Sequence, residues 1–330
     1  MSTLTDEVGA AHREDYWAAV SAADTDAAHA VAARALEAGL GVEDFLEQVV
    51  VEAQRRVGER WATNDWSVAQ EHAATAVSEA VVRRLADTLH VGPGPLLLVA
   101  CAEREWHAMP ALVLTTVLRA RGLDAVHTGA STSRDELVST ILDRGPRAVL
   151  LSASLSSSLP RLRRQVEAVR GTGTPVVVGG RAFTDARRWR TLGATAYAES
   201  PARALEVLAE LPRHVGAAPA LHHPGAAEAR ALQAGADRIV GDVLAALDLG
   251  NLALPPDDWR VVLATHTSHV VDSVASALLC DDPTVLSEAR AWLRDVVAGR
   301  GGDPAAVDRL WDALAHELRD FPVALTMLAG

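Results

Sequence analysis

A carboxylate and an imidazole stand two residues apart at Glu105 and His107, directly after a short apolar run at 96–101. A neutral imidazole is a good ligand for a borderline transition metal, and a neighbouring carboxylate fixes its tautomer and raises its basicity. The pair is therefore compatible with a metal ion held by His107, with Glu105 bonded to the other ring nitrogen. Taken alone, His107 would more often be an ordinary loop histidine.

A second group lies upstream, where Trp61 is followed, after nine intervening residues, by Glu71 and His72. The Asn-Asp pair at 64–65 ends one helix, and a capping box over 67–70 begins the next. Near that helix start the dipole favours a carboxylate and disfavours an imidazolium. Without support from elsewhere, a core tryptophan and a surface Glu-His pair are the simpler interpretation.

Composition narrows the classes of function. The chain has 330 residues, enough for two or three domains, and its 49% hydrophobic and 22% charged residues are typical of a soluble globular protein. No segment approaches the ~20 apolar residues of a membrane span, and no signal peptide is present, so we expect a cytoplasmic protein. The net charge of −12 gives no general attraction to nucleic acid or anionic lipid. All 31 basic residues are arginine, which excludes a lysine Schiff base.

Three segments follow one another along the chain. Residues 1–90 carry apolar residues at helical spacing and predict a helical bundle. Residues 91–213 alternate strands with helices, which predicts an α/β fold with a doubly wound parallel sheet. Residues 225–330 are again helical, with four or five helices. The predicted strands are 96–101, 125–128, 148–152, 175–178 and 194–197, and the helices between and after them are 110–121, 134–144, 159–170, 185–192 and 201–211.

Ligands of such sheets bind beyond the carboxyl ends of the strands, where three loops carry marked residues. Glu105 and His107 follow the first strand, Ser152 and Ser154 the third, and the Gly-Gly pair at 179–180 the fourth. These loops resemble the Asp/Glu-x-His-x-x-Gly, Ser-x-Leu and Gly-Gly elements of cobalamin-binding domains, which have a flavodoxin-like fold. The resemblance covers roughly 95–212.

This resemblance implies a role for each residue. His107 would be the lower axial ligand of cobalt, displacing the benzimidazole, and Ser152 could extend the hydrogen bonds beyond Glu105. Small residues at Ser154, Gly179 and Gly180 would leave a slot for the displaced nucleotide tail. Two departures stand out. A proline replaces the usual glycine at position 110, and the leucine at 155 falls one place late.

The upstream group resembles the Trp-x9-Glu-His motif of cobalamin-dependent photoreceptors of the carotenoid-repressor type. The resemblance implies a helical lid over adenosylcobalamin, in which Trp61 fills the space beside the adenosyl group. Glu71 would bond the ribose, and His72 would lie near the upper face. This chain has Ala62 where those repressors have a histidine, and it lacks their amino-terminal DNA-binding domain, so we expect no nucleic acid partner.

The third segment contains Trp259 and Arg260, followed by His266, His269 and Asp272 at helical spacing on one face. Such polar groups would suit an open-chain tetrapyrrole, whose pyrrole N–H groups need acceptors and whose propionates need Arg or His. The architecture resembles the photocobilins, which join a cobalamin photoreceptor to a globin-like domain that binds biliverdin. That resemblance implies a noncovalent biliverdin site. The alternative is a dimerisation bundle with buried histidines.

The leading hypothesis is a light sensor, not an enzyme, that binds adenosylcobalamin and biliverdin. Photolysis of the Co–C bond would change contacts in a homodimer or with a downstream signalling protein, without a nucleic acid or membrane partner. One alternative is a corrinoid shuttle for a methyltransferase, against which the tryptophan lid and the third segment both argue. The other is a protein that senses cobalamin level independently of light.

Overall fold

The computed structural model describes residues 3–184, 186–250 and 252–329, and its contacts divide the chain into two compact units. We call residues 1–95 and 109–127 the helical unit, and residues 96–108 and 128–330 the sheet unit. This division differs from the three predicted segments, because residues 109–127 group with the bundle and the C-terminal helices group with the sheet. The boundaries at 90, 213 and 225 stay a prediction.

The helical unit is the predicted bundle. Its helices are α1 (Thr3–Ser21), α2 (Thr25–Glu37), α3 (Val42–Phe45), η1 (Leu46–Val51, π-helical), α4 (Glu52–Ala62), α5 (Val68–Thr88) and α6 (Met109–Ala120). Tyr16 and Phe45 meet edge to face in its core, with ring centroids 5.7 Å apart. Helix α4 ends just before Asn64, whose φ of 62° is left-handed, and Ser67 and Gln70 form the predicted capping box of α5.

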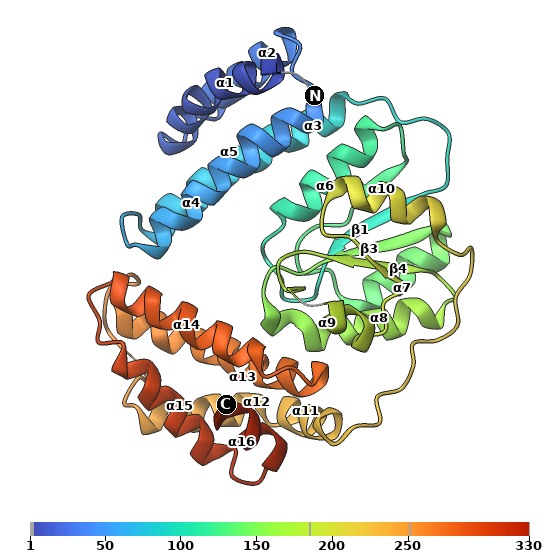
Figure 1. Ribbon diagram of the computed structural model, residues 1–330. Coiled ribbons are helices and arrows are strands. Elements are labelled where there is room, and N and C mark those ends of the chain that lie inside the picture. The colour runs from blue at the N-terminus through green and yellow to red at the C-terminus, as the bar shows by residue number, and fades with distance from the viewer. Residues whose placement is uncertain (1–2, 185, 251, 330) are drawn as a thin grey trace. The chain divides into compact units, whose positions relative to one another are not determined.

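The sheet has the predicted five parallel strands. They are β1 (Leu97–Cys101), β2 (Ala125–His127), β3 (Ala148–Ser152), β4 (Val176–Gly179) and β5 (Ala196–Tyr197), in the order β2-β1-β3-β4-β5. All residues of β1 and β3 are buried, as in a sheet covered on both faces. Figure 1 shows α7 (Arg134–Arg144), α8 (Leu159–Gly171) and α9 (Ala186–Thr191) on one face and α10 (Pro201–Glu210) on the other. The doubly wound α/β prediction is confirmed.

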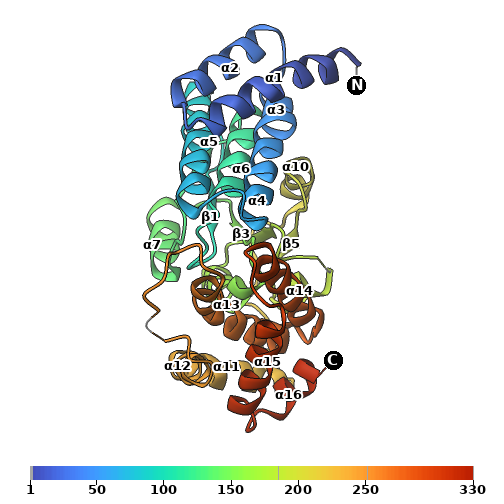
Figure 2. The same ribbon diagram turned by 90° about the vertical axis from the view of Figure 1, so that its left-hand side faces the viewer.

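The C-terminal part of the sheet unit is helical, as predicted. It contains α11 (Pro224–Ala234), α12 (Ala236–Ala246), α13 (Trp259–Cys280), α14 (Thr284–Gly299), α15 (Ala305–Glu317) and α16 (Pro322–Ala329), grouped together in Figure 2. Helix α13 contributes many of the buried residues in the hydrophobic core of these helices. Over the described ranges no helix combines the length and the apolar character that crossing a bilayer requires.

The coil that precedes these helices is held along the sheet unit by two arginines of α8. Arg163 donates to the carbonyl of Pro219 at 2.5 Å, and Arg170 donates to the carbonyl of Gly216 at 2.9 Å. This coil, residues 214–223, is therefore tied to α8 at two points along its length.

Candidate functional site

The loop after β1 places a fully buried carboxylate, that of Glu105, among several hydrogen-bond donors. Its Oε2 accepts from the backbone N–H groups of Ser154 at 2.9 Å and Leu155 at 3.0 Å. The hydroxyl of Ser158 donates to the same oxygen at 3.3 Å. Buried charges persist only when they are hydrogen-bonded, and this one is bonded by both backbone and side chain.

The imidazole of His107 is bonded to the other carboxylate oxygen. Its Nδ1 lies 2.6 Å from Oε1 of Glu105, which also accepts the backbone N–H of His107 at 3.1 Å. Burial pushes the pKa of Glu105 up, but the hydrogen bond and charge of His107 and the backbone donors outweigh it, so that pKa lies below its ordinary value. An ionised Glu105 fixes the ring proton on Nδ1.

The second ring nitrogen of His107 is left available. The side chain is 52% exposed, and no hydrogen bond to Nε2 arises from residues 3–184, 186–250 or 252–329. With its proton on Nδ1, the ring presents the Nε2 lone pair outward, which is the state in which imidazole binds a metal. The residues present thus fit a ring nitrogen that ligates cobalt.

The serine that supports Glu105 differs from the one that the sequence indicated. Ser152 ends β3, and its carbonyl accepts from the backbone of Ala102 at 2.9 Å, but within the described part of the chain its hydroxyl makes no bond to Glu105. That bond comes from Ser158, six residues further along. The 3₁₀ turn η2 (Ser156–Ser158) brings the later serine back to the carboxylate, and a role for Ser152 at the cofactor stays a prediction.

The two glycines predicted to leave a slot for the nucleotide tail, Gly179 and Gly180, are required by the packing of the protein backbone. A Cβ on Gly180, whose φ is +106°, would lie 2.3 Å from the carbonyl oxygen of Ala153. A Cβ on Gly179 would lie 2.6 Å from the carbonyl oxygen of Ala198. Close backbone approach therefore explains both glycines. A role for them and for the buried Ser154 in holding a nucleotide tail stays a prediction.

In the helical unit, Trp61 lies in the last turn of α4, and Glu71 and His72 lie in the first turns of α5. The carboxylate of Glu71 accepts from the hydroxyl of Thr75 at 3.0 Å and also pairs with Nδ1 of His72. The side chain of His72 is 74% exposed. The motif thus extends from the end of α4 to the start of α5, and its three residues all lie near the turn that joins these helices.

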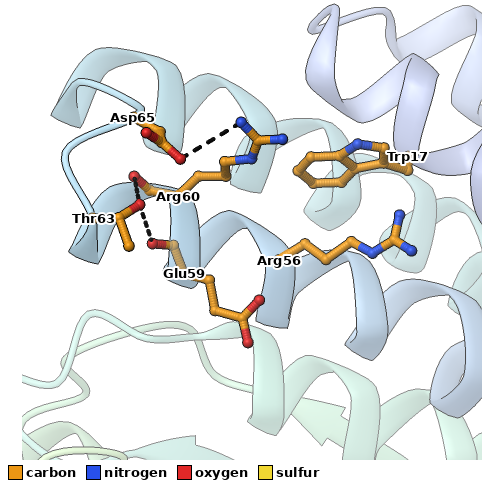
Figure 3. A pocket seen from close by; sticks show the side chains of 6 residues that line it. All are labelled: Trp17, Arg56, Glu59, Arg60, Thr63 and Asp65. Atoms are coloured by element: carbon orange, nitrogen blue, oxygen red, sulfur yellow. Dashed lines mark hydrogen bonds and ion pairs between the residues drawn. The ribbon is translucent and has the colours of Figure 1, made fainter.

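A pocket of about 350 Å³ in the helical unit is lined by a different set of residues, namely Trp17, Arg56, Glu59, Arg60, Thr63 and Asp65 (Figure 3). Arg60 pairs with Asp65 at 3.6 Å, and the Thr63 hydroxyl donates to the carbonyl of Glu59 at 3.0 Å. The other two charged residues pair outside this set, Arg56 with Glu14 and Glu59 with Arg55. Trp61, Glu71 and His72 are not among the residues that line the pocket.

The residues predicted for a bilin have protein partners. On α13, Nδ1 of His269 lies 3.2 Å from the Ser157 hydroxyl, and Asp272 accepts from Arg161 at 2.7 Å. His266 bonds through Nδ1 to a carbonyl of its own helix at 2.7 Å. The helix start is closed by Arg260, which pairs with its N-cap Asp258 at 2.9 Å, and Trp259 packs against Gly302.

The one cysteine of this helical region is unsuited to covalent attachment. Cys280 is buried at the end of α13, and desolvation raises the pKa of its thiol to about 12. A thiol in that state is a poor nucleophile. The predicted bilin site would therefore hold its pigment without a covalent bond.

Comparison with known proteins identifies two stretches of the chain. Residues 95–206 match a family model described as a B12 binding domain, and residues 12–86 match a second model of the same description. His107 and Glu105 fall in the first, and Trp61, Glu71 and His72 fall in the second. Over 139 residues the chain is 35% identical to the HTH-type transcriptional repressor CarH of Myxococcus xanthus, covering 38% of this chain and 43% of that protein.

Solved structures give weaker likenesses. The monomethylamine corrinoid protein of Methanosarcina barkeri has a TM-score of 0.49 at 20% identity, covering 59% of this chain and 96% of that one. A cobalamin-binding protein from Desulfitobacterium hafniense has a TM-score of 0.33 at 18% identity, covering 61% of this chain and 96% of that one.

Proposed function

We propose that this chain, a cobalamin-binding protein of the CarH type, is a light sensor that takes adenosylcobalamin with His107 as the lower ligand of cobalt. The observation that carries the proposal is the state of the His107 ring, which is half exposed and whose Nδ1 is held by a buried carboxylate, so that the proton on Nδ1 leaves the Nε2 lone pair for a metal. When bound, adenosylcobalamin supplies a Co–C bond that light can break.

The residues around His107 have separate tasks in this proposal. Glu105 holds the ring in one tautomer and one orientation, because its Oε1 bonds both the ring and the backbone of His107. Ser158 and the amides of Ser154 and Leu155 hold Glu105 in turn. Mutation of a residue that supports a metal ligand in this way typically lowers metal affinity by about 10–100-fold. The half-exposed ring can therefore reach a cofactor without first rearranging.

The helical unit favours light sensing over methyl transfer. Trp61, Glu71 and His72 are proposed to contact the upper ligand, and all three lie near one turn between α4 and α5. Because position 62 is alanine, His72 is the only imidazole between residues 52 and 89 that could approach cobalt after the adenosyl group leaves. Its exposed ring is available for that role once its bond to Glu71 is broken.

The test is a light–dark absorption experiment on the full chain reconstituted with adenosylcobalamin in the dark. We expect green illumination to change the spectrum of the wild-type complex and of a control, His90→Ala, which alters an exposed histidine. His107→Ala should change the dark spectrum itself, since the lower ligand is lost. A wild-type complex that is inert to light contradicts the sensor.

Two further measurements separate the alternatives. Transfer of the methyl group from bound methylcobalamin to a methyltransferase partner would identify a corrinoid shuttle. If the protein has the same oligomeric size and binds its partners equally well in the dark and after illumination, it is a sensor of cobalamin level. For the light sensor we expect illumination to change the state of a homodimer or its contacts with a downstream protein.

A biliverdin site in the C-terminal helices is the second part of the proposal. It is supported by the polar face of α13, although His269 and Asp272 already have partners that a bilin would have to displace. Coexpression with heme oxygenase tests it directly. Far-red absorption beside the corrin bands supports two pigments, whereas corrin bands alone leave these helices with a structural role.

A further inference from the structure

The short turn η2, which we call the serine turn (Ser156–Ser158), touches both the His107 site and helix α13. Ser158 donates to the carboxylate of Glu105 at 3.3 Å. Ser157 shares a hydrogen bond with Nδ1 of His269 at 3.2 Å. The carbonyl of Ser156 accepts from the hydroxyl of Ser276 at 2.6 Å. Three consecutive residues therefore join the support of the predicted metal ligand to the C-terminal helices.

These contacts are directional and shielded from water. The side chains of Ser157 and Ser158 are buried, and Ser276 has no exposed surface. A third contact clamps the helix nearby, because Arg161, three residues after the turn, pairs with Asp272 at 2.7 Å, and both side chains are nearly buried. Since a buried polar group is costly to leave unpaired, the turn cannot shift without breaking these bonds.

Helix α13 is thus placed to determine where the serine turn lies. His269 and Ser276 are seven residues apart on the helix and so share one face. Each of the two bonds a different residue of the turn. The turn is only three residues long and follows directly from the 154–155 amides that also bond Glu105. A displacement of α13 would therefore reach the carboxylate through both Ser158 and the backbone.

We propose that His269 and Ser276 are positioning residues for the cobalt ligand, holding the serine turn so that Glu105 stays aligned with His107. The inference rests on the proposed role of His107 as ligand, but not on light sensitivity. It assigns the C-terminal helices an indirect part in cobalamin binding, through the serine turn and Glu105. A change in the bonding of His107 would reach these helices through the same turn, and a change in α13 would alter the ligand.

The test uses the full chain and hydroxocobalamin in the dark, so that no photochemistry enters. The variants are Ser276→Ala and His269→Gln. The matched control is Ser273→Ala, because Ser273 is a buried serine of the same helix whose hydroxyl, among the residues that the structure describes, donates to a carbonyl of that helix at 2.8 Å and not to the serine turn. The visible spectrum reports whether histidine has replaced the benzimidazole, and titration gives the dissociation constant.

We expect the two variants to bind about tenfold more weakly than wild type, the lower end of the effect of groups that support a metal ligand. They should also show a smaller fraction of histidine-ligated cobalamin. Ser273→Ala should stay within about twofold. Ser276→Thr keeps the hydroxyl and should restore the wild-type spectrum, which a purely structural loss would not predict.

Two outcomes overturn the inference, and they differ. If His107→Ala leaves the spectrum unchanged, the ligand assignment fails and the inference fails with it. If His107→Ala changes the spectrum but both α13 variants behave like Ser273→Ala, the ligand stands and the positioning role is refuted. Circular dichroism verifies the fold of each variant, and if Ser276→Ala does not fold, His269→Gln decides the question.

Discussion

The substitution Glu105→Gln probes the proposed ligand most sharply, because it keeps the shape of the side chain and replaces one acceptor by a donor. The amide has two orientations at this position. If its oxygen faces Ser154 and Leu155, its NH₂ faces Nδ1 of His107. The ring nitrogen must then accept, so the ring proton moves to Nε2 and blocks the lone pair that would bind cobalt.

The opposite orientation carries a cost in stability. The amide oxygen then accepts from His107, but the NH₂ faces two backbone N–H groups that have lost their acceptor. Each unpaired buried donor costs about 1–3 kcal/mol, or about 2–6 kcal/mol for the pair before relaxation. The first orientation leaves one backbone donor without its acceptor, the N–H of His107, and the second leaves two, so the first is the cheaper one. We expect the loss to appear mainly as weaker cobalt ligation, about 10–100-fold in affinity.

The assay is titration with hydroxocobalamin in the dark, followed by its visible spectrum, together with urea unfolding of the ligand-free protein. Glu103→Gln serves as the matched control, since that side chain lies two residues away and is not bonded to His107. Wild-type affinity and an unchanged spectrum for Glu105→Gln would refute the argument that an ionised carboxylate fixes the ring. Equal effects of Glu103→Gln would attribute the change to charge alone.

Three further predictions concern stability. Arg188→Met removes a fully buried cation that pairs with Asp282 at 2.8 Å and should lower the free energy of unfolding in urea by about 3 kcal/mol. Gly180→Ala forces a Cβ to 2.3 Å from a carbonyl oxygen at a φ of +106°, and a melting curve should show a loss of about 2–4 kcal/mol. Burial, and then the charge of Arg83, lower the pKa of His127 to about 4 from 6.5, so the unfolded chain takes up a proton first as the pH falls and stability is lost from pH 6.5 down through 4. Urea titrations at pH 7 and pH 4 should show that His127→Phe removes about 1–2 kcal/mol of this loss, a value reduced for partial exposure, and an equal loss in the variant would contradict the assignment.

The sheet could be predicted closely because its signals are local. Strands β1 and β3 are continuous apolar runs, and the capping boxes at Ser67 and Ser133 begin α5 and α7 where the sequence indicated. The break between α11 and α12 at Gly235 was not predicted, since a single glycine among alanines and polar residues resembles a helix interior. That break explains why six described helices replace the predicted four or five.

The contact between Glu105 and His107 was accessible from the sequence because the two residues lie two positions apart. The contacts that hold Glu105 in place were not accessible from the sequence. Ser158 reaches Glu105 across 53 positions of the chain, and Ser157 reaches His269 across 112. No local pattern distinguishes these serines from Ser152. Only the 3₁₀ geometry of the turn selects the hydroxyl that faces the carboxylate.

The polar face of α13 shows why residue type alone could not decide its function. A bilin and a neighbouring protein surface need the same groups, namely carboxylates, imidazoles and guanidinium ions. In the structure, Asp272 and His269 are bonded to α8 and to the serine turn. If these residues also bind a bilin, that ligand must break bonds that tie α13 to the serine turn and to α8. Occupancy of such a site would then alter the ligation of cobalt, and by linkage cobalamin would alter bilin affinity by the same factor.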